Sequence, residues 1–250
     1  MPSLSAHFNI ALKSEDRDSV LLIDETFGAY LLGSVTPDIR IINKQDRIIT
    51  HFSDLDNRII GQGAENMHIQ YPDLFNKANL SNAKKAFISG YINHLVADET
   101  WIKVVYEPYF SNDLLFESIE EANVYDRVLQ LDLDRLSRDS LSDMEIIKEH
   151  ILKMTIDFHL DFLPDSIVVQ WRDWLLESMS WGFSWERIRR LAYRQKSNNT
   201  NLIDQIAQSF LNDIPANLTI LYNKLPNNII DLYLSEVRKN YNEIKYRYLT

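Results

Sequence analysis

The sequence predicts an all-α protein, and three observations support that fold class. Only 6 Gly and 7 Pro occur in 250 residues, so helices can run for long stretches and a fold with many β-turns is disfavoured. Apolar residues recur at three- and four-residue intervals in several segments, which is helical spacing. Hydrophobic residues make up 45% of the chain and charged residues 25%, an ordinary globular composition. We therefore expect a single multi-helix domain with a buried core.

Two long segments carry the clearest helical pattern. In residues 83–109 the stripe at i, i+3 and i+4 steps consists of Phe87, Tyr91, His94, Leu95, Asp98, Ile102 and Val105. The second segment, 142–163, repeats the spacing with Ile146, Ile147, His150, Met154, Asp157 and Phe158. It opens on Ser142 followed three residues later by Glu145, which is typical of a capping box.

Four shorter helices are predicted in the rest of the chain. They cover residues 166–179, 184–195, 200–212 and 228–246, with breaks at 198–200 and 226–228. We expect residues 1–165 to form the helical core that carries the candidate metal ligands. Residues 166–250 are predicted to pack on it as a further helical layer of the same domain.

One early segment, 31–52, is interrupted in a way that suggests a functional loop. Gly33 and Pro37 mark the interruption, and it places Asp38 just after a helix end. A charged residue on a loop within an apolar run is a better functional indication than a core residue. A later acidic stretch, LQLDLDRL at 129–136, lacks the glycine and ligand spacing of a calcium loop and is interpreted as a solvated face.

Charge and composition exclude several classes of protein. A net charge of -10 argues against a dedicated nucleic-acid or anionic-membrane binder. With no cysteine in the chain, a metal site must use His, Asp, Glu or backbone groups. The chain contains no run of about 18 apolar residues, so no transmembrane helix is expected. The first residues lack the pattern of a signal peptide. We expect a cytoplasmic protein and leave its oligomeric state open.

The pair His94 and Asp98 poses the central question of function. With six His and 36 acidic residues, one His–carboxylate pair at this spacing is expected by chance, so the spacing alone carries no information. The pair does share one face of a helix that is otherwise apolar. A buried Asp is costly unless it is paired or bound to metal, so the residues predict either a hydrogen-bonded core pair or a metal site.

Four pieces of sequence resemble a known family when they are taken together and in order. They are AHFNIA at 6–11, LLGSVTPDI at 31–39, THF at 50–52 and GYINHLVAD at 90–98. The series is similar to that of the zinc-dependent phospholipase C family, which is related to single-strand nucleases with a trinuclear zinc cluster. The resemblance covers about the first hundred residues. It implies an all-α scaffold of the phospholipase C and single-strand nuclease type.

The resemblance also implies a set of functional residues. Asp38 corresponds to a bridging carboxylate, His51 to a ligand on the following segment, and His94 with Asp98 to the helix-borne pair. His7 resembles an N-terminal ligand that joins Asp98. Asp38 and Asp98 are the implied catalytic residues, because bridging carboxylates hold metal ions around a shared water that attacks phosphorus.

Two further ligands of the family are missing or changed here. No His occurs near Val104, and Met154 stands where a Glu four residues after His150 is expected. We therefore predict a reduced site with one or two zinc ions, with His150 as a ligand from the later helix. Arg40 and Lys44 are predicted to bind the phosphate of a substrate, and Trp101 to line the cavity.

Three functions follow from these observations. The first is a metal-dependent hydrolase of a phosphoester, of the phospholipase C type. The second is a non-catalytic relative that keeps the fold and binds a ligand or partner through its aromatic C-terminal half. The third is a protein in which the metal is purely structural and its coordination shell is closed.

Overall fold

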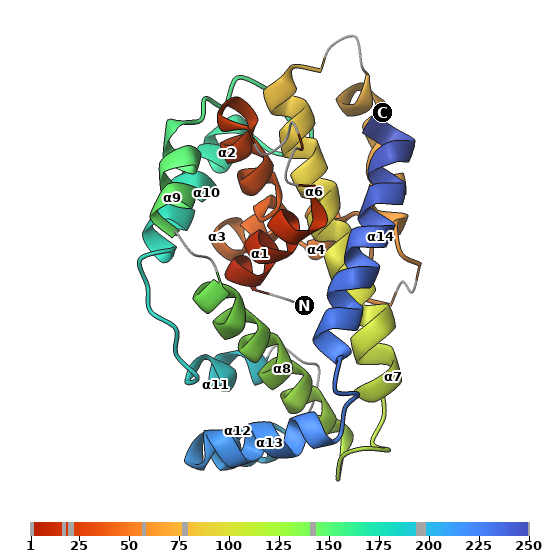
Figure 1. Cartoon of the computed structure of the whole chain (residues 1–250), viewed down its shortest axis with the longest axis vertical. Helices are drawn as coiled ribbons and strands as arrows, with labels where there is room; N and C mark the ends of the chain where they lie inside the picture. Colours follow the sequence, from red (N-terminus) through yellow and green to blue (C-terminus); the bar gives the residue numbers. More distant parts are fainter. Residues whose placement is uncertain are drawn as a thin grey trace.

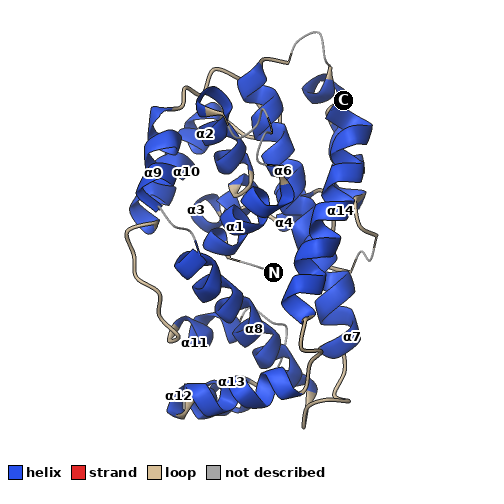
Figure 2. Ribbon diagram, in the orientation of Figure 1, coloured by secondary structure: helices blue, strands red, loops and turns tan. Residues whose placement is uncertain are grey.

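The structure is a computed structural model, and it describes residues 3–16, 19, 23–56, 59–76, 80–140, 144–193 and 199–249. Helices connected by loops make up its regular structure (Figure 2), which confirms the all-α prediction. Within the same part of the chain no strand forms, and the only β-type pairing is an isolated bridge between Leu160 and Leu163.

The helices follow one another through short connections (Figure 1). The first half of the chain contains α1 (Leu4–Ser14), α2 (Asp24–Gly33), η2 (Thr36–Ile39), α3 (Arg40–Asn43), α4 (Arg47–His51), α5 (Gln62–Gln70), η3 (Pro72–Phe75), α6 (Asn82–Thr100), η5 (Trp101–Tyr106) and α7 (Glu107–Tyr109). The second half contains α8 (Ile119–Ser140), α9 (Met144–Lys153), α10 (Asp165–Ser178), α11 (Arg187–Ala192), α12 (Thr200–Asn212), α13 (Ile214–Asn223) and α14 (Ile229–Leu249).

The predicted helix over 83–109 is confirmed, with one local change of geometry. α6 passes at Trp101 into η5, a six-residue π-helix, before α7 completes the segment. The Ser81 side chain accepts a hydrogen bond from the backbone N–H of Lys84 and so caps the start of α6. The helices expected over 166–179, 200–212 and 228–246 are present as α10, α12 and α14.

The long helix predicted over 142–163 is wrong in its second half. α9 ends at Lys153, and the chain then runs without helix to the start of α10 at Asp165. Phe158, Leu160 and Phe162 are buried, while the residues between them are exposed. This period-2 alternation is typical of an extended segment with one buried face. The expected cap at Ser142 lies outside the described residues.

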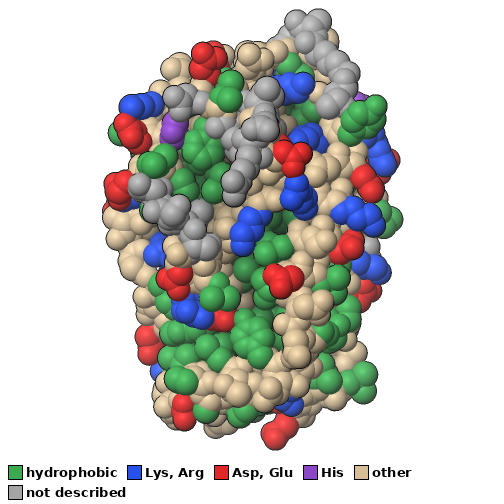
Figure 3. Space-filling model, viewed as in Figure 1, with side chains coloured by type: hydrophobic (Ala, Val, Ile, Leu, Met, Phe, Trp, Pro, Cys, Tyr) green, Lys and Arg blue, Asp and Glu red, His purple; other side chains and the backbone are tan. Residues whose placement is uncertain are grey.

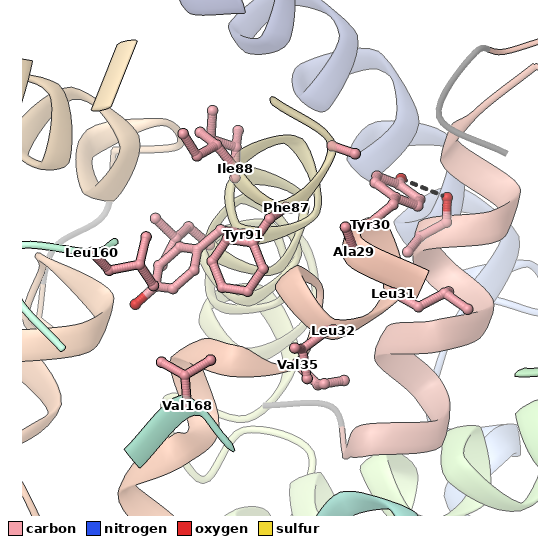
Figure 4. Packing of buried hydrophobic residues seen from close by; sticks show 14 of the residues in the cluster. Ala29, Tyr30, Leu31, Leu32, Val35, Phe87, Ile88, Tyr91, Leu160 and Val168 are labelled. Atoms are coloured by element: carbon pink, nitrogen blue, oxygen red, sulfur yellow. Dashed lines mark hydrogen bonds between the residues drawn. The ribbon is translucent and has the colours of Figure 1, made fainter. Parts of the chain in front are cut away.

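Two glycines allow α2 and α6 to pack at backbone contact. A Cβ on Gly90 would lie 2.0 Å from the Tyr30 carbonyl oxygen, and a Cβ on Gly33 would lie 2.0 Å from the Phe87 carbonyl oxygen. Around this contact Tyr30, Phe87 and their neighbours form a close-packed cluster (Figure 4). The contact fixes the end of α2, and therefore the start of the Asp38 loop, against the helix that carries His94.

The buried apolar side chains form two clusters that meet on α6. The first contains residues up to Val96 of this helix, together with α2, α9 and α10. The second contains residues of α6 from Ala97 onward, together with α8, α12 and the first half of α14. The C-terminal helices thus share both cores with the N-terminal ones, since α14 packs against α6 and α1 and α11 packs against α8.

The acidic stretch at 129–136 is not the solvated face that was predicted. It lies in α8, where Asp132 is 2% exposed and Asp134 is 1% exposed. Asp132 accepts hydrogen bonds from Arg135 and Tyr222, and Asp134 accepts one from Arg187. Such pairing is what makes a buried carboxylate tolerable, and sequence spacing alone does not reveal partners this far along the chain.

The described surface shows no concentration of one charge on the face seen in Figure 3, where acidic and basic side chains are scattered among apolar ones. Among the helices of the described residues, none is both long and apolar enough to cross a bilayer.

Candidate metal centre

Five predicted ligands come together from four elements. His7 lies on α1, Asp38 on η2, His51 at the end of α4, and His94 with Asp98 on α6. Two overlapping groups form among the described residues, one of His7, His94 and Asp98 and one of Asp38, His51 and His94. In each group the possible ligand atoms lie within 4.8 Å of one another. The junction of the two hydrophobic clusters on α6 is therefore also the place where these side chains meet.

The Asp98 carboxylate is the centre of the arrangement. Its oxygens lie 3.5 Å from His7 Nε2, 3.3 Å from His51 Nε2 and 3.6 Å from His94 Nε2. Asp38 Oδ1 lies 3.9 Å from His51 Nε2. The rings of His7 and His94 stack with centroids 3.8 Å apart, which sets their Nε2 atoms side by side.

These distances suit ligands around an ion better than hydrogen bonds. N–H···O hydrogen bonds have lengths of about 2.7–3.2 Å. Two ligand atoms bound tetrahedrally to zinc at about 2.0–2.1 Å lie about 3.4 Å apart. The Nε2 atoms of all three His and Oδ1 of Asp98 are buried and have no hydrogen-bond partner. Buried polar atoms are normally satisfied, so the unsatisfied set fits a bound cation.

Hydrogen bonds on the far side of two rings orient their Nε2 atoms. His94 Nδ1–H donates to the Ser34 carbonyl oxygen at 2.9 Å, because a carbonyl can only accept. His51 Nδ1 lies 3.1 Å from Thr50 Oγ1, which also lies 3.4 Å from the Arg47 carbonyl oxygen. In the neutral tautomer of His94, Nε2 therefore carries the lone pair that a metal needs, and His51 offers the same atom in the tautomer in which Nδ1–H donates to Thr50.

One lone pair on His94 limits how many ions this residue can bind. Since Nδ1 is engaged by Ser34, Nε2 can coordinate a single ion. His94, which belongs to both groups, could therefore serve only one of them as a ligand if two ions were bound.

The electrostatics of the cluster favour the protonation states that metal binding requires at His51, His7 and Asp98, but not at His94. Burial lowers the pKa of His94, but the neighbouring Asp98 outweighs burial and raises it, so a metal ion must displace a proton from this ring. Burial, helped by the neighbouring Arg47 charge, lowers the pKa of His51 to about 4. Burial and His94 also lower the pKa of His7. Burial opposes ionisation of Asp98, but His94 and the other imidazoles outweigh it and hold the pKa of Asp98 well below its usual range. At neutral pH the site thus offers neutral His51 and His7 and an anionic Asp98.

Access to the cluster is on the side of Asp38. His7 and His94 are fully buried, and His51 and Asp98 are 1% exposed. The Asp38 side chain, by contrast, is 24% exposed. Asp38 is therefore the candidate ligand that an incoming molecule would meet first.

His150, the sixth predicted ligand, is not part of either group. It lies on α9, where its ring meets Phe27 edge-on at 4.9 Å and its carbonyl abuts Gly28. The local packing of α9 on α2 accounts for its place. His150 is thus not brought to this centre.

In the part of the chain that the structure describes, none of the three predicted substrate-binding residues forms a hydrogen bond or ion pair with the cluster. Trp101 is buried in the second core cluster, and its indole N–H donates to Asp126 of α8 at 2.9 Å. The π-helix that begins at Trp101 moves the chain off the α-helical register of His94 and Asp98. Arg40 is exposed. Lys44, which directly follows α3, donates from Nζ to the Ile41 carbonyl oxygen of that helix.

Arg47 is a residue of the site that the sequence did not indicate. Its Nη2 donates to Asp98 Oδ2 at 2.9 Å, and only 12% of its side chain is exposed. Arg47 begins α4 and lies four residues before His51, so both reach the cluster from one face of a short helix. That i, i+4 relation is visible in the sequence, but it points to the site only once His51 is known to face inward.

Two further buried residues support the centre without joining it. The Tyr91 hydroxyl donates to the Thr50 carbonyl and ties α4 to α6 one turn before His94. The Glu99 carboxylate accepts from the backbone N–H groups of Gly61 at 2.6 Å and Gly63 at 2.7 Å. Glu99 thereby caps the start of α5, and burial raises its pKa to about 7 despite these donors.

Replacing Glu99 with glutamine should destabilise the protein by about 1–3 kcal/mol, because one carboxamide nitrogen would face an N–H donor. Urea unfolding measures the loss. Glu149→Gln is a suitable control, since Glu149 is exposed and pairs with exposed Lys153, so the change should alter stability by less than about 0.5 kcal/mol. Equal stabilities of the two variants would contradict the capping role.

Comparison with known proteins assigns no family or function to the chain. No protein-family model, no curated protein and no solved structure matches the chain.

Proposed function

We propose that this centre binds one or two zinc ions and that the protein hydrolyses a phosphoester. The observation that supports the proposal is the convergence of buried, unpartnered ligand atoms from His7, His51, His94 and Asp98, with Asp38 at the open edge. Imidazole and carboxylate donors suit zinc and its neighbours among divalent metals. The short motifs shared with zinc-dependent phospholipases C point to the same chemistry.

The residues of the chain have distinct roles in this proposal. His7 and His51 present neutral imidazoles, His94 gives up its proton when the ion binds, and Asp98 supplies the negative charge that a divalent ion requires. Asp38 lies at the exposed edge, where it can accept a proton from water or orient the substrate. Zinc, when bound, acts as a Lewis acid and lowers the pKa of a coordinated water to about 7.

Metal content is the direct test. Elemental mass spectrometry of untagged wild-type protein should find about one or two zinc ions per chain. The double variant His94→Ala with Asp98→Ala should hold almost none. Zinc-loaded wild type should then hydrolyse members of a panel of phosphomonoesters and phosphodiesters, and chelation should abolish the activity. Absence of metal in the wild type after soaking with zinc, manganese and iron would refute the proposal.

The burial of the ligands favours one second candidate, a structural zinc site. Four of the five side chains are nearly inaccessible, and a closed coordination shell is the mark of a structural site. In that case zinc would raise the melting temperature of the wild type, and no substrate in the panel would be hydrolysed. The hydrolysis assay on zinc-loaded protein therefore separates the two functions.

A further inference from the structure

Arg47 stands beside the candidate metal centre with most of its hydrogen-bonding capacity unused. A guanidinium carries five N–H donors. One nitrogen, Nη2, donates to Asp98 Oδ2, whereas Nε and Nη1 are buried and have no partner among the described residues. A charged donor buried without an acceptor is unfavourable, so the arrangement suits a ligand that supplies acceptors.

The position of Arg47 relates that ligand to the metal. Asp98 Oδ2 lies 2.9 Å from Arg47 Nη2 and also faces His51 and His94. An ion bound to this oxygen at about 2.1 Å would be no more than about 5 Å from the guanidinium nitrogen. A single phosphoryl group can span that gap, with one oxygen toward the ion and another accepting from the guanidinium.

The other basic residues of this segment are less suited to the task. Arg40 is exposed, and the exposed Lys44 directs its ammonium group to a backbone carbonyl of its own helix. Lys44 itself has a left-handed backbone with φ of 59°, which ends α3 and redirects the chain into α4. The change of direction is what brings Arg47, rather than its two basic neighbours, against Asp98.

We infer that Arg47 binds the phosphoryl group of the substrate and holds it beside the metal ion. This inference rests on the proposed function, and it replaces Arg40 and Lys44 with a residue that contacts the centre. The planar guanidinium suits phosphate because it donates parallel hydrogen bonds to two oxygens, which an ammonium group cannot do.

Phosphate binding to zinc-loaded protein tests the inference without an activity assay. Inorganic phosphate is titrated calorimetrically into wild type, Arg47→Met and a matched control, Arg238→Met, all loaded with stoichiometric zinc. Arg238 also pairs with an aspartate, Asp16, but at the exposed surface. We expect Arg47→Met to bind phosphate at least about tenfold more weakly. Its zinc content and the phosphate affinity of the control should match the wild type.

The possible outcomes separate the inference from the proposed function. Unchanged phosphate affinity in zinc-loaded Arg47→Met, or no phosphate binding by zinc-loaded wild type, would overturn the role of Arg47 and leave the zinc site standing. Failure of the wild type to take up zinc would overturn both, and it is detected before phosphate is added. If Arg47→Met does not fold, Arg47→Lys decides: weaker phosphate binding supports the inference, and equal binding overturns it.

Discussion

Replacing Asp98 with asparagine should remove zinc from the protein and with it the hydrolytic activity. Asp98 faces all three imidazoles at 3.3–3.6 Å and supplies the buried negative charge of the cluster. An amide of the same shape keeps the volume but has no charge to offer the ion. We expect the zinc dissociation constant to rise at least about a hundredfold, or about 2.8 kcal/mol, as measured by competition with a chromophoric chelator.

The same substitution removes the partner of Arg47, so a loss of stability must be separated from a loss of metal. Asp134→Asn is the matched control, because Asp134 is equally buried and accepts a hydrogen bond from Arg187 at 2.7 Å. In the metal-free protein Asp98→Asn should cost about 3–5 kcal/mol of stability. Asp134→Asn should cost less, because the Arg187 side chain is 32% exposed and water can solvate it, whereas Arg47 is 12% exposed. Only Asp98→Asn should lose zinc, and retention of zinc by this variant would remove Asp98 from the ligand set.

A methyl group at Gly90 should destabilise the fold by about 3 kcal/mol or more. Its Cβ would lie 2.0 Å from the Tyr30 carbonyl oxygen and 2.8 Å from the Ser34 backbone nitrogen, and backbone atoms of a packed helix cannot move aside independently. Since the Ser34 carbonyl orients His94, a shift of α2 away from α6 should also weaken zinc binding. Urea unfolding and zinc titration measure the two effects.

Gly182→Ala provides the control for that experiment. Nothing lies within 4 Å of a Cβ at Gly182, so alanine should change stability there by less than about 0.5 kcal/mol. A similar small change for Gly90→Ala would mean that α2 and α6 do not touch as closely as described. An intermediate loss of stability with unchanged zinc affinity would separate the helix contact from the orientation of His94.

The helix of His94 and Asp98 was predictable from apolar residues at helical spacing, although the folded helix is buried on every side from Ala86 to Thr100. Apolar residues at helical spacing define α6, and the i, i+4 relation then places both side chains on one face. The position of Asp38 just after a helix was predictable for another reason, since Gly33 and Pro37 indicate that α2 ends there. His7 and His51 came from the family resemblance, because no local pattern shows that α1 and α4 point at the same helix.

The errors have equally local causes. The helix predicted through Met154 failed where a period-2 alternation of Phe158, Leu160 and Phe162 overlaps the end of a helical period, and the extended pattern prevailed. That Arg40 and Lys44 bind phosphate stays a prediction, but the sequence did not indicate that Arg47 contacts Asp98. Lys44, whose backbone is left-handed, ends α3 just before α4 begins at Arg47. A left-handed backbone at a residue other than glycine is difficult to predict from sequence. The inward orientation of Arg47 was therefore difficult to predict as well.

The packing of α14 has a consequence for the order of events during synthesis. The Tyr233 hydroxyl of this helix donates to the Ala97 carbonyl oxygen, beside Asp98. Every candidate ligand precedes Thr100 in the chain, whereas α14 begins only at Ile229. On the ribosome the imidazoles and carboxylates therefore emerge well before the helix that packs against them. Under the proposed function, a metal ion would have its freest route to the ligands in that interval, and docking of α14 would then slow its escape.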